Sequence, residues 1–141
     1  MTTPIRTLSI RTVLLADAGI TGVTGLLMLL GAGPLADLLD LPTALLRGAG
    51  LVLFPYVAYL VWLSTREKTP HQAVWPVVAA NFAWAAGCVA VLLSGQVEPN
   101  GLGVAFILVQ AVAVLIFADL QVVALRGNQP DRVKNAFTLE V

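Results

Sequence analysis

Residues 102–125 read LGVAFILVQAVAVLIFADLQVVAL, an apolar run in which only three side chains are amides or carboxylates. At 1.5 Å per residue, a helix of this length extends roughly 36 Å, which is enough to cross the hydrocarbon core of a bilayer. The run is continuous and does not alternate between apolar and polar residues. It therefore predicts a transmembrane helix and not a strand of a membrane barrel.

Three further stretches have the same character, and together they predict spans at about 12–30, 48–63, 74–93 and 102–125. Of the 141 residues, 58% are hydrophobic and only 11% are charged, whereas a soluble domain usually carries about a quarter charged residues. We therefore predict an all-α membrane protein, in which residues 1–126 form one antiparallel bundle of four transmembrane helices. Residues 127–141 are predicted to form a polar cytoplasmic tail.

The connections between the spans contain helix-breaking residues. A Gly-Pro step within residues 31–34 ends the first span. The following residues place four leucines against Asp37 and Asp40, which predicts a short interfacial helical turn between the first two spans. Polar turns are predicted at 64–72 and 94–101.

The basic residues predict the orientation of the bundle. In a four-span arrangement every basic residue except Arg47 falls on one side of the membrane, and the positive-inside rule makes that side cytoplasmic. Both termini are then cytoplasmic. The first span contains Asp17 and is long, so we expect it to be retained and not cleaved as a signal peptide. The residues on the cytoplasmic side are Arg6, Arg11, Arg66, Lys68, Arg126, Arg132 and Lys134.

Two ionisable residues, Asp17 and Asp119, lie inside the predicted spans. A charge at the centre of a bilayer costs at least about 2.5–3.5 kcal/mol, so such residues usually face the interior of the bundle and mark function. Counting residues from the charged flanks places four polar side chains roughly 10 Å inside the cytoplasmic boundary. These side chains, one from each span, are Asp17, Tyr59, Asn81 and Asp119, and we predict that they form one intramembrane polar layer.

Two interpretations of this layer stay open. A carboxyl group in a medium of low dielectric favours its protonated form, so the layer can be a proton- or cation-coupled site. The layer can instead be structural, with Asn81 and Tyr59 satisfying the carboxylates by hydrogen bonds across the helices. Nearby polar and aromatic residues extend the candidate site, and the predicted cavity-lining residues are Thr21, Thr24, Trp84 and Gln110.

Other residues carry expectations about packing and lipid. Ala18, Gly22 and Gly25 form a face of small residues, which allows close helix approach, most simply within the chain and alternatively between subunits. Pro55 removes a backbone donor and is predicted to kink the second span. Arg47, at the outer edge, is predicted to bind lipid phosphate or to pair with a neighbouring aspartate.

The same sequence excludes several classes of function. Cys88 is the only cysteine and His71 the only histidine, so no site can be built from several thiolates or imidazoles. We find no nucleophile–base pair and no phosphate-binding loop, and we predict that the protein is not an enzyme and has no cofactor. The net charge is zero and no basic patch occurs, so no nucleic-acid partner is expected.

Four short segments carry a resemblance to a known family. The segments LLAD (14–17), LLRGAGL (45–51), NFAW (81–84) and ADLQ (118–121) resemble those of a family of small bacterial four-span membrane proteins. This resemblance implies a location in the bacterial inner membrane and no particular chemistry. The chain is also similar to the small multidrug resistance transporters, which carry an acidic residue in the first helix as Asp17 does here. It departs from them because theirs is a glutamate and their loops are shorter than residues 31–47.

Two functions of different classes follow. The first is an oligomeric transporter or channel for a small cation or a lipophilic solute, with Asp17 and also Asp119 as the candidate coupling sites. Its partners are the bilayer and further copies of the chain, because four helices leave little room for a pore. The alternative is a non-catalytic membrane module that packs with a partner protein or binds lipid through Gly22, Gly25 and Arg47.

Overall fold

The computed structural model describes residues 8–127, and all the regular secondary structure within them is helical. Four of its helices are long and apolar enough to cross a membrane, which confirms the predicted all-helical, four-span character. Of the predicted polar tail at 127–141, Gly127 is still part of a helix, and residues 128–141 lie outside the described residues, as do Arg6, Arg132 and Lys134. The helices are α1 (Ile10–Leu30), α2 (Ala32–Leu39), α3 (Thr43–Ser64), α4 (His71–Leu93) and α5 (Gly101–Gly127).

The short helix predicted between the first two spans is α2. It ends at Asp40, whose backbone adopts the left-handed conformation (φ 52°, ψ 48°) that commonly follows the last turn of a helix. Helix α3 then begins at Thr43, earlier than the apolar run at 48, because Leu46 is already buried against the rest of the bundle. Helix α3 also continues through Pro55.

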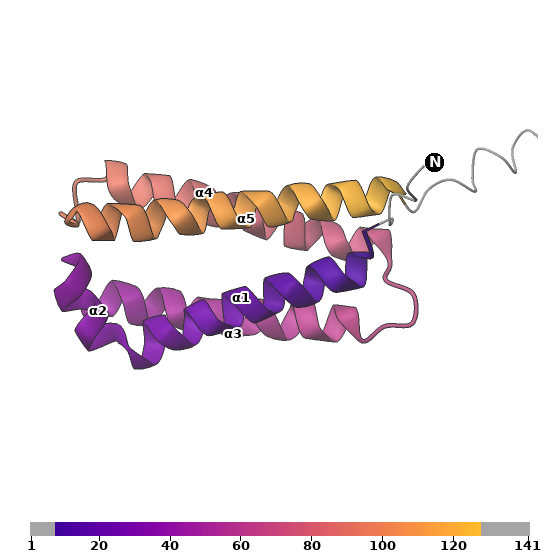
Figure 1. Cartoon of the computed structure of the whole chain (residues 1–141), viewed down its shortest axis with the longest axis horizontal. Coiled ribbons are helices and arrows are strands. Elements are labelled where there is room, and N and C mark those ends of the chain that lie inside the picture. The colour runs from indigo at the N-terminus through magenta and orange to yellow at the C-terminus, as the bar shows by residue number, and fades with distance from the viewer. Residues whose placement is uncertain (1–7, 128–141) are drawn as a thin grey trace, which may run out of the picture.

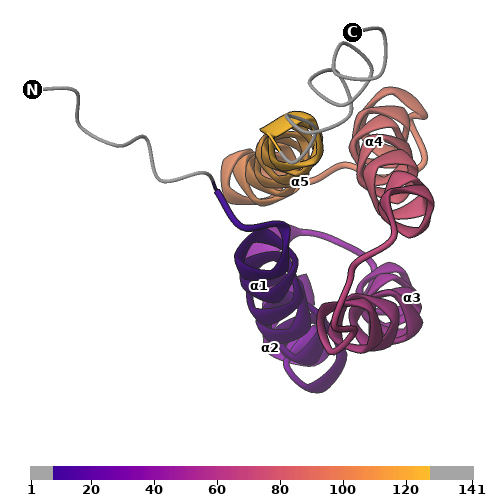
Figure 2. The ribbon, with the colours of Figure 1, turned by 90° about the vertical axis from the view of Figure 1, so that its right-hand side faces the viewer.

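The four long helices form two pairs (Figure 1). Helix α1 packs along α3, and α4 packs along α5, with extensive contact inside each pair. Between the pairs, α1 meets α5, whereas α3 and α4 approach each other much less closely. Figure 2 shows the four helices end on, grouped around a common axis. The bundle is therefore tightly closed within each pair and more open between α3 and α4.

Small residues make the close approach of α1 and α3 possible. A Cβ atom added to Gly50 would lie 2.9 Å from the backbone oxygen of Gly25, and one added to Gly25 would lie 3.3 Å from the Cβ of Leu53. Gly22 faces Val57 at an ordinary contact distance, and the neighbouring Ala18 is buried. The small-residue face of α1 is thus used for packing inside the chain.

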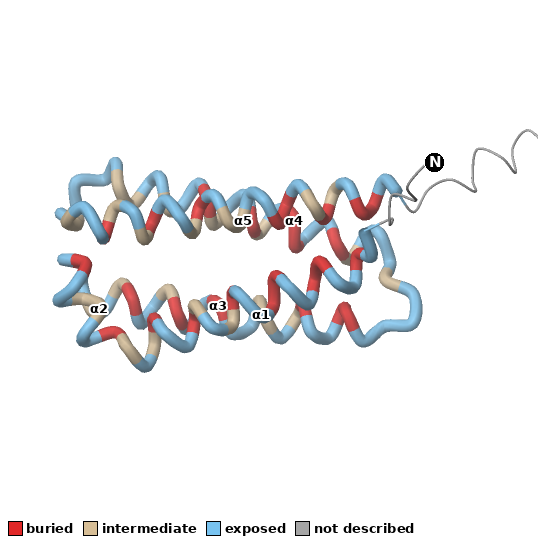
Figure 3. The backbone as a smooth tube through the Cα atoms, viewed as in Figure 1, coloured by how far each residue is buried: buried red, intermediate tan, exposed pale blue. Residues whose placement is uncertain are grey.

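Buried apolar side chains form two separate clusters along the bundle. One lies towards the α3–α4 turn and includes Leu14, Leu60 and Val74. The other lies towards α2 and includes Met28 and Leu46. Buried residues alternate along each helix with exposed ones (Figure 3), and many of the exposed residues are large and apolar. Such an exterior suits lipid and not water.

Asn100, just before α5, links α2 to α5. Its side-chain oxygen accepts a hydrogen bond from the backbone N–H of Gly103 at 2.9 Å, which satisfies one of the free donors at the start of α5. Its side-chain amide donates to the backbone oxygen of Leu38 at 2.8 Å, and its backbone N–H donates to that of Leu39 at 3.2 Å. This one residue therefore joins the two helix pairs at the end that carries α2.

Candidate functional site

Five polar side chains meet between the four long helices. Asp17 and Thr21 come from α1, Tyr56 from α3, Asn81 from α4 and Gln121 from α5, and we call this group the polar cluster. Asp17 and Gln121 are completely buried, and Asn81 is nearly so. Asp17 is therefore removed from solvent and surrounded by neutral polar groups from every long helix.

Hydrogen bonds connect all five members of the polar cluster. Oδ2 of Asp17 contacts the Tyr56 hydroxyl at 2.8 Å, Nε2 of Gln121 at 2.8 Å and Nδ2 of Asn81 at 3.2 Å. Oδ1 of Asp17 accepts from the Thr21 hydroxyl at 2.9 Å. Nδ2 of Asn81 also donates to Oε1 of Gln121 at 3.2 Å, and the Tyr56 hydroxyl lies 2.9 Å from Oδ1 of Asn81. Among the described residues no buried side-chain nitrogen or oxygen lacks a partner.

The structure brings together two of the four residues predicted for the layer, Asp17 and Asn81, and places the other two elsewhere. Asp119 is exposed on α5. At 100° per residue, Asp119 and Gln121 point in roughly opposite directions, so the helix that turns Gln121 inward turns Asp119 outward. Gln121, and not Asp119, is the residue that α5 contributes.

Tyr59 lies one helical turn beyond Tyr56, nearer the α3–α4 turn. Its hydroxyl donates to the backbone oxygen of Ala73 at 2.8 Å, and its ring stacks on Trp62 at 5.7 Å between centroids. The guanidinium of Arg66 lies 4.2 Å above the Trp62 ring. Tyr59 therefore belongs to an aromatic group that joins α3 to the start of α4. The tyrosine that α3 contributes to the polar cluster is Tyr56, and not the predicted Tyr59.

A cavity of about 470 Å³ lies between the helix pairs, on the α2 side of the polar cluster. Its walls are almost entirely apolar and come from all four long helices. The polar residues in its lining are Thr21, Tyr56, Asn81 and Gln110, of which three belong to the polar cluster. The cavity thus has apolar walls and a polar inner end.

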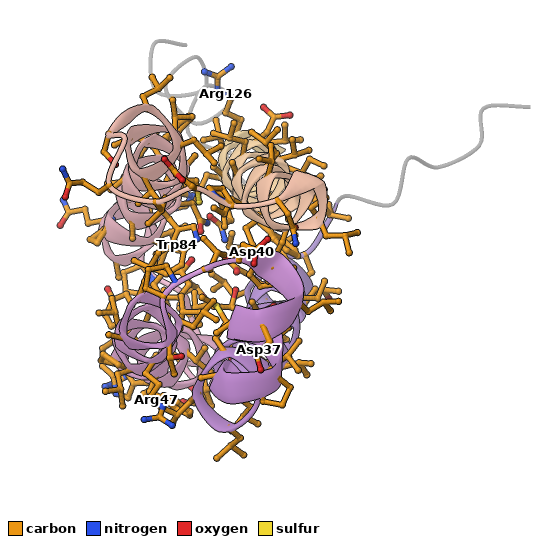
Figure 4. All side chains as sticks on the ribbon, turned by 90° about the vertical axis from the view of Figure 1, so that its left-hand side faces the viewer. Asp37, Asp40, Arg47, Trp84 and Arg126 are labelled. Carbon is orange, nitrogen blue, oxygen red and sulfur yellow. The ribbon has the colours of Figure 1, made fainter. Side chains whose placement is uncertain are left out.

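The cavity opens between α3 and α4. Among its lining residues, Val52 on α3 and Ala83 and Gly87 on α4 are exposed on the outside of the bundle. Of the long helices that neighbour each other around the bundle (Figure 2), α3 and α4 make the least contact. In Figure 4 the Trp84 side chain lies between the ribbons of α3 and α4. The opening therefore faces the surroundings of the bundle sideways, where the exposed side chains are apolar.

The four residues predicted to line a cavity are all found in cavity walls. Thr21, Trp84 and Gln110 line the large cavity, and Cys88 lies beside them. Thr24 lines a small adjoining cavity of about 40 Å³, and its hydroxyl donates to the backbone oxygen of Ile20 at 2.8 Å. Gln110 makes no side-chain hydrogen bond within residues 8–127, so its amide is available to the cavity.

The remaining predicted residues are not members of the polar cluster. Arg47 is exposed near the start of α3, and Figure 4 shows its side chain at the edge of the bundle, apart from Asp37 and Asp40. Pro55 is exposed on α3, next to Tyr56. No group of three or more histidine, cysteine, aspartate or glutamate side chains that could hold a metal ion occurs within the described part of the chain.

Comparisons with protein-family models, with curated protein sequences and with solved structures find no match to this chain. The resemblance to a family of small bacterial four-span proteins therefore stays a prediction, and the candidate site is interpreted from its own geometry.

Proposed function

We propose that this multi-pass membrane protein binds a small, neutral, lipophilic molecule in the cavity between its helix pairs and acts as a carrier for it. The observation that supports this most directly is the apolar cavity that ends on the polar cluster and opens sideways between α3 and α4. A solute dissolved in the bilayer can enter such an opening without passing through water.

The chemistry of the cavity favours a neutral solute over a cation. Its volume lies within the range of about 300–1,000 Å³ that is typical of small-molecule sites, which combine apolar walls with a few polar groups. Both carboxyl oxygens of Asp17 are already hydrogen-bonded to neutral groups of the polar cluster. The Gln110 amide and the Tyr56 hydroxyl are the polar groups that we expect to orient a ligand.

The occupant can be tested with Trp84 as a reporter. In a chain with Trp62→Phe and Trp75→Phe, Trp84 is the only tryptophan, and para-dibromobenzene is a small neutral lipophile whose bromine atoms quench tryptophan on contact. In lipid nanodiscs we expect quenching of Trp84 to saturate as the probe fills the cavity. In the matched chain that keeps only the lipid-facing Trp75, quenching should rise in proportion to the probe concentration.

A plug in the opening provides a second control. Gly87 lines the cavity and has no heavy atom within 4 Å of the position of an added Cβ, so Gly87→Leu should fill the opening and abolish saturable quenching of Trp84. Ala86→Leu, on the exposed side of the same turn, should leave the saturable quenching of Trp84 intact. Quenching that rises in proportion to the probe concentration at both Trp84 and Trp75 would overturn the proposal. Quenching of Trp84 by brominated acyl chains, and not by the probe, would also overturn it and would identify a lipid tail as the occupant of the cavity.

We also propose that the bundle is antiparallel, with both termini on the cytoplasmic side of a bacterial inner membrane. In support, Arg11 of α1 donates a 2.7 Å hydrogen bond to the backbone oxygen of Arg66 after α3, which brings two basic residues to the same end. Arg47 lies near the opposite end of α3. That transport requires a homo-oligomer stays a prediction.

This topology predicts which loop can be labelled from outside the cell. Cys88 is the only native cysteine, so a Cys88→Ala chain can carry a single new thiol at either of two exposed loop positions, Glu67 or Glu98. A membrane-impermeant maleimide applied to bacterial spheroplasts should label Glu98→Cys and leave Glu67→Cys unlabelled until the cells are lysed. The reverse pattern would show that the termini lie on the outer side.

A further inference from the structure

Four side chains of the polar cluster form a closed ring of contacts. The ring runs from Asp17 to Tyr56 (2.8 Å), from Tyr56 to Asn81 (2.9 Å), from Asn81 to Gln121 (3.2 Å) and from Gln121 back to Asp17 (2.8 Å). Each of these contacts joins two electronegative atoms at hydrogen-bond distance, so each needs one proton between its atoms. The ring therefore needs four protons.

The neutral members of the ring supply only three. Tyr56 has one hydroxyl proton, and each amide presents its oxygen to one neighbour and its nitrogen to the other, so Asn81 and Gln121 supply one proton each around the ring. Reversing either amide moves these protons between contacts without changing their number. An ionised Asp17 only accepts, so it would leave two oxygens facing each other at about 2.8–2.9 Å without a proton.

We infer that Asp17 is a proton-binding site and carries the fourth proton of the ring, as a neutral carboxylic acid. Its Oδ2–H then donates to Tyr56, Tyr56 donates to Asn81, Asn81 donates to Gln121, and Gln121 donates to Oδ2 of Asp17. The carbonyl oxygen Oδ1 accepts from Thr21. The second proton of Nδ2 of Asn81 donates to Oδ2 of Asp17, so every contact is satisfied, as buried polar groups require.

The surroundings of Asp17 contain no charge that would hold it ionised. The groups that face it are Thr21 on its own helix, Tyr56 on α3, Asn81 on α4 and Gln121 on α5, and among these only Tyr56 can titrate. The charged groups on the packed helices point elsewhere. Asp119 is exposed, and Arg11 donates to the backbone beyond α3. All four members of the ring belong to the chain itself, so the ring needs its fourth proton whether or not the cavity holds a ligand.

Infrared spectroscopy in nanodiscs tests the proton directly. At neutral pH we expect a band from a protonated carboxylic acid that shifts in heavy water, is lost in Asp17→Asn and is kept in the matched Asp119→Asn chain. Absence of this band from the unmodified protein at neutral pH would overturn the inference. Because this measurement needs no ligand, its outcome is separate from that of the quenching experiment.

The stability of two Asp17 variants gives an independent readout. The carboxamide introduced by Asp17→Asn supplies two donors, so with both ring amides reversed every ring contact again holds a proton, and only the Tyr56 hydroxyl proton lacks an acceptor within the ring. Its midpoint of thermal unfolding should fall by no more than a few degrees, whereas Asp17→Leu, which removes two ring contacts and the hydrogen bonds with Thr21 and Asn81, should unfold at a much lower temperature. An equal loss in both variants would show that Asp17 acts as an ionised acceptor.

Discussion

Gly103→Ala is expected to lower the free energy of unfolding by about 3 kcal/mol, at the upper end of the cost of overpacking. Gly103 lies in the first turn of α5, against the last turn of α2. An added Cβ would collide with the backbone oxygen of Leu39 and would lie 2.7 Å from the Cβ of Pro99. Backbone cannot move aside as a flexible side chain can, so α2 and α5 must separate and lose the hydrogen bonds of Asn100.

The matched control is Gly101→Ala, two residues earlier on the same helix. Nothing lies within 4 Å of an added Cβ there, so the free energy of unfolding should change by less than about 1 kcal/mol. Both values can be measured by reversible unfolding in mixed micelles, followed by the far-ultraviolet circular dichroism of the helices. Equal effects at the two glycines would contradict the close contact between α2 and α5.

Asn81→Leu is expected to lower the free energy of unfolding by about 2–6 kcal/mol, because it leaves two buried polar groups without partners. The substitution leaves the Tyr56 hydroxyl proton without an acceptor and Oε1 of Gln121 without a donor. Each buried polar group left without a partner costs about 1–3 kcal/mol. The same reversible unfolding in mixed micelles gives the value.

Gln110→Leu provides the matched control for that result, because both substitutions remove an amide from the middle of a transmembrane helix. Gln110 lines the cavity and makes no side-chain hydrogen bond within the described residues, so its replacement should be neutral or slightly stabilising. If Gln110→Leu proved as costly as Asn81→Leu, the loss would reflect general polarity and not the ring.

The number and the approximate extent of the spans could be predicted because lipid imposes a simple rule, which is about 20 apolar residues in each crossing. Asp17 could be predicted to point inward for a related reason, since an isolated carboxyl group facing lipid is costly, but the same reasoning also turned Asp119 inward, and Asp119 is exposed. Asn81 followed from its depth. The extent of a span and the depth of a residue depend only on position along the chain, which the sequence determines.

The partners of Asp17 depend on rotation and register, and the sequence does not determine either. Tyr56 and Tyr59 differ in depth by less than one helical turn of 5.4 Å, so counting residues from a charged flank cannot choose between them. Asp119 and Gln121 lie at similar depths and differ mainly in the side of α5 on which their side chains point, which depends on the rotation of the helix. Once Asp17 is placed inside the bundle, it needs neutral hydrogen-bonding partners at its own depth. Gln121 is the amide of α5 at that depth, so a search of α5 for amides would have identified it.

The split between the two helix pairs has a consequence for the surrounding lipid. The pairs are packed together at the end near the α3–α4 turn, whereas the cavity separates them in the other half of the bundle. Any widening of the opening between α3 and α4 therefore increases the cross-section of the protein in one leaflet and hardly changes it in the other. If the protein carries a solute as proposed, we expect the work of admitting it to be done against the lateral pressure of that single leaflet, so that the composition of one lipid monolayer sets how readily the bundle opens.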